Sequence, residues 1–132
     1  MLDFSIGMRL IDSFSQIVSS KYMFPLCSEF IKKLIVSTNP FERRAGVSSI
    51  GSIAEGCTEK VKEVLEEIVN TLVNLFLNDQ STIVKTACIV TMDFLTQYCS
   101  PEIIEHHDKV LPMLLKGLES STEEVLEKSL IE

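Results

Sequence analysis

The sequence contains no tryptophan, and its 132 residues include only 12 lysines and arginines against 19 aspartates and glutamates. Proteins that bind nucleic acids or anionic membrane surfaces need clustered basic side chains, so the net charge of −7 argues against both kinds of partner. No stretch of about 18 uninterrupted apolar residues is present, and we therefore expect no transmembrane helix. With 45% apolar residues, the chain is too hydrophobic to be a disordered segment.

The four cysteines lack any spacing typical of a metal site. They form no C-x-x-C pair, and neither His106 nor His107 stands at a zinc-binding distance from one of them. The amino-terminal residues also lack the basic start and the continuous apolar stretch of a secretory signal. We therefore expect reduced, buried thiols and a location in the cytoplasm and nucleus.

No catalytic constellation emerges from the remaining polar residues. Gly46, Gly51 and Gly56 recur every five residues, but no Walker spacing and no Lys-Ser/Thr pair accompanies them, so close helix approach explains them better than a phosphate loop. The neighbouring serines have no evident His–Asp partners. The sequence predicts a protein that is not an enzyme, with no cofactor and no metal site, which acts by surface recognition.

Apolar residues follow the helical period almost everywhere. Between residues 60 and 78 they recur at spacings of three and four, at Val61, Val64, Leu65, Ile68, Val69, Leu72, Leu75 and Phe76. No alternating strand pattern is present, so we predict an all-α fold. The start and stop signals divide the chain into helices at roughly 2–19, 22–37, 40–56, 59–78, 81–98, 101–118 and 121–132, which form a single domain over 1–132.

Three sites show residues that are suited to begin a helix. Asn39-Pro40 and Ser100-Pro101 each combine a capping side chain with a proline, whose missing N–H costs nothing in the first helical turn. Thr58 is a candidate cap for the helix that begins near Glu59. Because the connections between helices are short, consecutive helices are expected to lie antiparallel.

An internal repeat of 41–42 residues relates the helices to one another. Arg43 corresponds to Lys85, and Cys57 corresponds to Cys99. A pair of helices repeated at this interval is typical of a HEAT unit, and such units stack into a right-handed α-α superhelix of the armadillo type. In the HEAT consensus an aspartate precedes a basic residue by six positions, as Asp79 precedes Lys85, and these groups connect adjacent repeats.

Both ends of the chain look cut from a longer array, because terminal repeats of a solenoid normally carry polar outer faces. The first helix is instead rich in apolar residues, and the last helix has hardly begun when the chain stops at Glu132. We therefore expect a fragment of about three repeats with truncated ends, which are predicted to favour self-association.

Residues 41–79 resemble the importin-β (karyopherin-β) family of nuclear transport receptors. The resemblance rests on the Arg-x-Ala-Gly start of one helix, its Ala54-Glu55-Gly56-Cys57 end, and the run Glu67 to Asn70. These features are most similar to the branch called importin-five or karyopherin-beta-three. The resemblance implies a receptor that binds cargo, phenylalanine–glycine nucleoporins and the GTPase Ran. A generic HEAT scaffold, phosphatase-scaffold-like or chromosome-organising, is the alternative.

The resemblance further implies a convex surface formed by segments 22–37, 59–78 and 101–118, where nucleoporins enter grooves between neighbouring helices. Segments 40–56, 81–98 and 121–132 would then line a concave surface that holds cargo and Ran.

Two groups of residues are candidates for partner contacts. The first is a mixed concave patch on the predicted helix 81–98, comprising Lys85, Ile89, Met92, Asp93 and Thr96. Burial of this patch against the next repeat is the alternative that we favour, because stacked helices bury two sides. The second group is an acidic convex face of Glu63, Glu66 and Glu67, which could meet a basic cargo but also fits an ordinary solvated helix face.

Overall fold

The computed structural model describes residues 4–131, and the side chains of 15–16 and 121–131 lie outside the description. The described chain is helical and contains no strand, which confirms the all-α prediction. Its elements are α1 (Phe4–Ile17), α2 (Ser20–Ile35), α3 (Pro40–Gly56), α4 (Thr58–Glu63), α5 (Leu65–Asn78), α6 (Thr82–Tyr98), the 3-10 helix η1 (Glu102–His106) and α7 (His107–Ile131).

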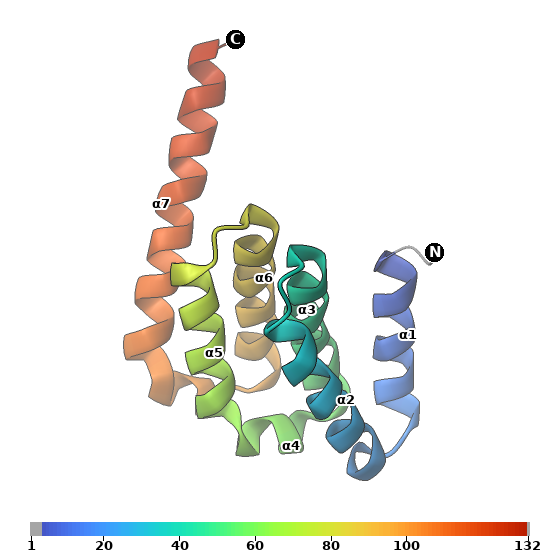
Figure 1. Ribbon diagram of the computed structural model, residues 1–132. Helices are drawn as coiled ribbons and strands as arrows, with labels where there is room; N and C mark the ends of the chain where they lie inside the picture. Colours follow the sequence, from blue (N-terminus) through green and yellow to red (C-terminus); the bar gives the residue numbers. More distant parts are fainter. Residues whose placement is uncertain (1–3, 132) are drawn as a thin grey trace.

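The helices form two layers (Figure 1). In one layer, which we call the α3 layer, α3 lies between α1 and α6. The other layer, the α5 layer, contains α2, α5 and α7; here α2 packs on α3, α5 packs on α6, and α7 lies beside α5. Stacking of helix pairs in this manner is the arrangement of HEAT repeats.

The core lies between the layers and is centred on α3 and α6. Val47 and Ala54 of α3, and Val84, Met92 and Leu95 of α6, are fully buried. Each buried side chain of valine or leucine size contributes about 1.5–3 kcal/mol relative to an exposed one. The burial of α3 and α6 therefore holds adjacent helix pairs together.

The predicted helix 59–78 is interrupted in the structure. Val64 leaves the helical conformation, with φ −116° and ψ 21°, and separates α4 from α5. The interruption allows Val61 before it and Leu65 after it to be buried. Thr58 does not cap a helix, because it is itself the first residue of α4 and its hydroxyl donates to the Ala54 carbonyl oxygen of α3 at 2.6 Å.

The predicted boundary between 101–118 and 121–132 is absent, since α7 continues through it to Ile131. Residues 119–122 include neither glycine nor proline, so nothing in their backbone chemistry stops the helix. Ser100 makes no capping hydrogen bond, and the chain instead enters α7 through η1. The cap at Asn39 is confirmed, because its Oδ1 accepts from the Phe41 N–H at 2.9 Å.

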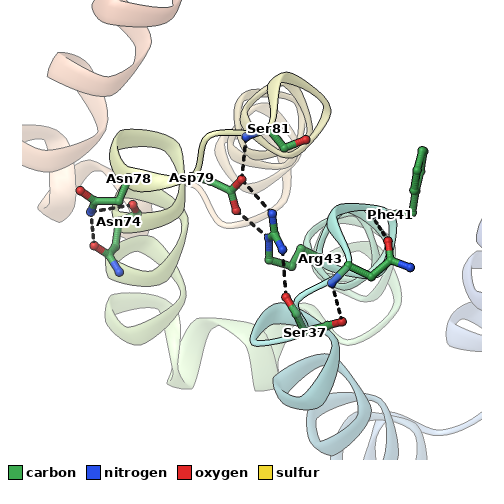
Figure 2. Close-up of polar contacts among 8 residues, drawn as sticks. Ser37, Phe41, Arg43, Asn74, Asn78, Asp79 and Ser81 are labelled. Carbon is green, nitrogen blue, oxygen red and sulfur yellow. Dashed lines mark hydrogen bonds and ion pairs between the residues drawn. The ribbon is translucent and has the colours of Figure 1, made fainter.

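An ion pair joins the start of α3 to the turn between α5 and α6 (Figure 2). The Arg43 guanidinium donates to both carboxylate oxygens of Asp79, at 2.7 and 3.1 Å, and to the Ser37 carbonyl oxygen at 2.9 Å. Asp79 also accepts from the Ser81 N–H at 2.9 Å. The hydrogen bond from Arg43 is the main cause of the lowered pKa of Asp79. This largely buried pair connects adjacent repeats, but the basic partner of Asp79 is Arg43 of the preceding repeat rather than Lys85, which the HEAT spacing singled out.

Replacement of Arg43 by alanine is expected to lower the free energy of unfolding by about 2 kcal/mol, because it leaves the Asp79 carboxylate without its charged partner. Urea denaturation followed by circular dichroism measures the change. The control is Lys60→Ala, which removes only an exposed pair with Glu63 and should cost less than about 0.5 kcal/mol.

The same pair makes stability depend on pH. Because the pKa of folded Asp79 is below its unfolded value, its contribution is present at neutral pH and is lost as the pH falls through the folded pKa. The stability difference between wild type and Asp79→Asn should therefore shrink below about pH 4. If the stability difference between wild type and Asp79→Asn stays constant until the protein unfolds in acid, the stabilising role of the Asp79 carboxylate is contradicted.

Two glycines allow close packing around α3. A Cβ atom at Gly46 would lie 2.9 Å from the Leu34 Cβ and 3.2 Å from the Ile35 backbone nitrogen, and one at Gly51 would lie 3.1 Å from the Phe94 ring. These positions face α2 and α6 respectively. The close approach of helices that the sequence predicts for these glycines is therefore confirmed.

The variant Gly46→Ala is expected to lower the free energy of unfolding by about 1–3 kcal/mol, because the α2 backbone must move to accept the methyl group. Gly7→Ala is the matched control in α1. Nothing lies within 4 Å of the added Cβ there, so the gain in helix propensity should raise stability by about 0.5–1 kcal/mol. Thermal unfolding of both variants tests whether Gly46→Ala lowers stability while Gly7→Ala raises it.

Candidate protein-binding groove

An apolar groove of about 210 Å³ lies between α2 and α5. Helices α2, α3 and α5 line it with the residues Phe24, Ser28, Ile31, Lys32, Ile35, Ile50, Ile53, Val64, Glu67, Ile68 and Thr71. We call it the α2–α5 groove.

The floor and walls of the α2–α5 groove come from different layers. Ile50 and Ile53 of α3 form a buried floor, only 4% and 2% exposed. Ile35 of α2 and Ile68 of α5 are half-buried walls. Because α2 packs on α3 while α5 packs on α6, a gap remains between α2 and α5 on the outside of the α5 layer.

One basic and one acidic residue, Lys32 and Glu67, lie at the rim of this groove, and both are exposed. Ser28 and Thr71 add hydroxyl groups. A site with an apolar floor and few polar groups suits an inserted aromatic or aliphatic side chain.

The predicted concave patch on α6 is not one surface. Met92 is fully buried and is a core residue, so its assignment as a partner contact is wrong; stacked repeats bury this side of the helix. Asp93 is exposed and accepts from Gln97 at 3.2 Å, while the Thr96 hydroxyl donates to the Asp93 carbonyl oxygen at 2.6 Å. Lys85 and Ile89 are half-buried and line a separate groove against α7.

The predicted acidic face is exposed. Glu63, Glu66 and Glu67 lie along a shallow depression with Val64, Asn70 and Thr71. Glu63 lies 4.0 Å from Lys60, and Glu66 lies 3.9 Å from Lys109. Ion pairs as exposed as these contribute little to stability, so the carboxylates remain accessible, and a role in binding stays a prediction.

A cluster that the sequence analysis missed lies on the α3 layer. Asp12 and Glu55 line a groove of about 320 Å³ between α1, α3 and α6. Desolvation and the Asp12 carboxylate raise the pKa of Glu55, while desolvation and Glu55 raise the pKa of Tyr98. Asp12, Glu55 and Tyr98 follow one another at intervals of 43 residues, close to the repeat length. This interval is the sequence signal that could have revealed the cluster.

Comparison with known proteins agrees with the repeat architecture. The HEAT-like repeat family matches residues 40–90. Mouse importin-4 is 21% identical over 114 residues, which are 86% of this chain and 10% of that protein. Importin subunit beta-3 of Saccharomyces cerevisiae is 27% identical over 104 residues, which are 78% of this chain and 10% of that protein. Part of the chain therefore matches a HEAT-like repeat, and most of it is similar to importins.

This importin-like chain spans about a tenth of the length of the curated relatives that it matches. No solved structure matches it. No helix in the described part of the chain is long and apolar enough to cross a membrane. The described residues also contain no group of three or more histidine, cysteine or acidic side chains that could hold a metal ion.

The first helix of this HEAT array exposes apolar side chains. Leu10, Phe14 and Ile17 are 49%, 55% and 82% exposed. The predicted self-association has a suitable surface here, and it stays a prediction. The last predicted segment, 121–132, has its side chains outside the described residues, so its concave role stays a prediction as well.

The cysteines occupy largely apolar positions among the helices. Cys57, Cys88 and Cys99 are buried, and Cys27 is partly exposed. Burial raises the pKa of every one of these thiols, and that of Cys88 rises to about 12. Since the thiolate is the reactive form, buried thiols of this kind are poor nucleophiles.

Alkylation of the native protein with iodoacetamide is expected to label Cys27 first, while the three buried cysteines stay protected until the chain unfolds. Mass spectrometry after a timed reaction, with and without urea, measures the order. Labelling of Cys88 in the native protein at the rate of Cys27 would contradict the burial.

Proposed function

We propose that the chain is a portion of a nuclear transport receptor that binds phenylalanine–glycine nucleoporins through the α2–α5 groove. The apolar groove between two neighbouring helices of the α5 layer is the observation that carries the proposal, and the similarity to importins supports it. Such a receptor would work in both the cytoplasm and the nucleus.

The dimensions of the α2–α5 groove suit a single phenylalanine ring with its backbone at the rim. Complete burial of a phenylalanine side chain contributes about 1.5–3 kcal/mol. Because a millimolar dissociation constant already corresponds to about −4 kcal/mol, one groove supplies only a weak contact. Weak contacts repeated along an array give a strong but rapidly exchanging association, which suits transport.

On this proposal the α5 layer is the convex surface and the α3 layer is the concave one. The concave layer then presents Asp12 and Glu55, and it would hold cargo or Ran. The short connection between α5 and α6, residues 79–81, leaves the proposed Ran contact to the helices themselves.

A synthetic phenylalanine–glycine repeat peptide tests the proposal. Its addition to the isotope-labelled chain is expected to shift the backbone amide resonances of Ile35, Ile68 and Thr71 in nuclear magnetic resonance spectra. Ile68→Ala should weaken binding about tenfold, because about 1.4 kcal/mol of apolar contact is lost. The matched control is Val90→Ala, which trims an apolar side chain of the α3 layer that is 49% exposed.

A peptide with serine in place of phenylalanine should produce no shifts. Equal shifts from both peptides, or shifts that avoid the α2–α5 groove, would contradict nucleoporin binding at this position. A second arm immobilises Ran loaded with GTP or GDP. Retention of the chain by Ran-GTP but not by Ran-GDP supports the proposed transport receptor. If the chain binds neither the peptide nor Ran, a generic HEAT scaffold is favoured.

A further inference from the structure

We propose that a second groove, between α5, α6 and α7, binds an acidic amphipathic helix of a partner protein. This α6–α7 groove has a volume of about 610 Å³. Its lining residues are Phe76, Leu77, Thr82, Lys85, Thr86, Ile89, Leu114, Lys116, Gly117, Leu118 and Ser120. The proposal does not depend on nucleoporin binding, which concerns the α2–α5 groove.

The apolar part of the α6–α7 groove is well defined by packing. Phe76 is buried, and Ile89 is half-buried against Gly117 of α7. A Cβ atom at Gly117 would lie 2.9 Å from the Ile89 Cδ1, so the glycine allows α7 to approach α6 closely. Leu77 and Leu118 remain 50% and 64% exposed and form an open apolar strip.

The charges of this groove have one sign. Lys85 and Lys116 line it, and none of the described side chains that line it is a carboxylate, although the chain carries a net charge of −7. Neither lysine forms an ion pair with a described side chain. Lys85 also contributes to the low pKa of Asp79, but Arg43 holds that carboxylate. Among the described side chains, none forms an ion pair with either ammonium group, which favours an acidic partner.

The α6–α7 groove differs in this respect from the other two grooves. Lys32 and Glu67 balance one another at the α2–α5 groove, and the groove of the α3 layer contains Asp12 and Glu55. An apolar strip flanked by two positive charges matches a helix with apolar residues on one face and carboxylates beside them. Complementary charge favours this partner over a basic or neutral helix, which would leave the lysines unpaired.

The test uses a fluorescein-labelled peptide in which leucines recur at helical spacing with glutamates between them. Fluorescence anisotropy should show binding to the full chain that weakens as salt is added. The same peptide with lysine in place of glutamate should bind at least tenfold more weakly. Lys85→Gln with Lys116→Gln should also weaken binding at least tenfold, whereas the control Lys33→Glu, an exposed lysine of α2, should leave it unchanged.

The variant Leu77→Ser tests the apolar contribution to peptide binding separately from that of the lysines. Leu77 is exposed, so it can be replaced without disturbing the core. This variant should weaken binding of the acidic peptide severalfold, and the binding that remains should still depend on salt. Circular dichroism confirms that each variant is folded. Phenylalanine–glycine binding should persist in all of these variants, so failure in one groove remains distinguishable from failure in the other.

Three results would overturn the proposal. The first is no binding of the acidic peptide to the wild-type chain. The second is equal binding by wild type and the double glutamine variant. The third is concentration-dependent dimerisation, seen by sedimentation velocity, that disappears in the double variant and competes with the peptide; the occupant would then be a second copy of the chain.

Discussion

The burial of α3 by α1, α2 and α6 is the constraint on which the rest of the structure depends. Val47 and Ala54 have no exposed surface, and Gly46 lets the α2 backbone approach within ordinary contact distance. The Thr91 hydroxyl of α6 donates to the Val47 carbonyl oxygen at 3.1 Å inside this interface. A single helix pair could not enclose α3, so each pair depends on its neighbour for a core, as in any solenoid.

This dependence produces surfaces that differ in chemistry. The α2–α5 groove lies where α2 packs on α3 while α5 packs on α6, whereas the α6–α7 groove lies among three helices that contact one another. The α2–α5 groove is apolar with balanced charges, the groove of the α3 layer contains Asp12 and Glu55, and the α6–α7 groove contains two lysines. The spaces between helices, rather than a cluster of reactive side chains, are therefore where the proposed binding sites lie.

Periodicity predicted the all-α fold and the repeat spacing predicted stacked helix pairs, whereas the consensus spacing matched Asp79 with Lys85 and did not predict its ion pair with Arg43. These patterns did not predict the interruption at Val64, because burial of Val61 and Leu65 together is a tertiary requirement. Met92 was assigned to a surface because a helical wheel shows one helix alone, whereas α6 is covered on more than one side. The resemblance implied grooves between such neighbouring helices, but the sequence did not predict that Ile50 and Ile53 of α3 form the floor of the α2–α5 groove, because this depends on packing between the layers.

The ion pair and the α2–α5 groove lie at the same junction between repeats. Asp79 follows α5 directly, and Arg43 stands near the start of α3, so their two hydrogen bonds fix the position of one end of α5 relative to α3. The groove is bounded by α5 and floored by α3. A ligand that widens it must shift α5 against α3 and strain the Arg43–Asp79 pair. A ligand can move this equilibrium only by its differential affinity for the two arrangements. If the groove binds a partner as proposed, its occupancy is therefore expected to be coupled to the position of α5 through the Arg43–Asp79 pair.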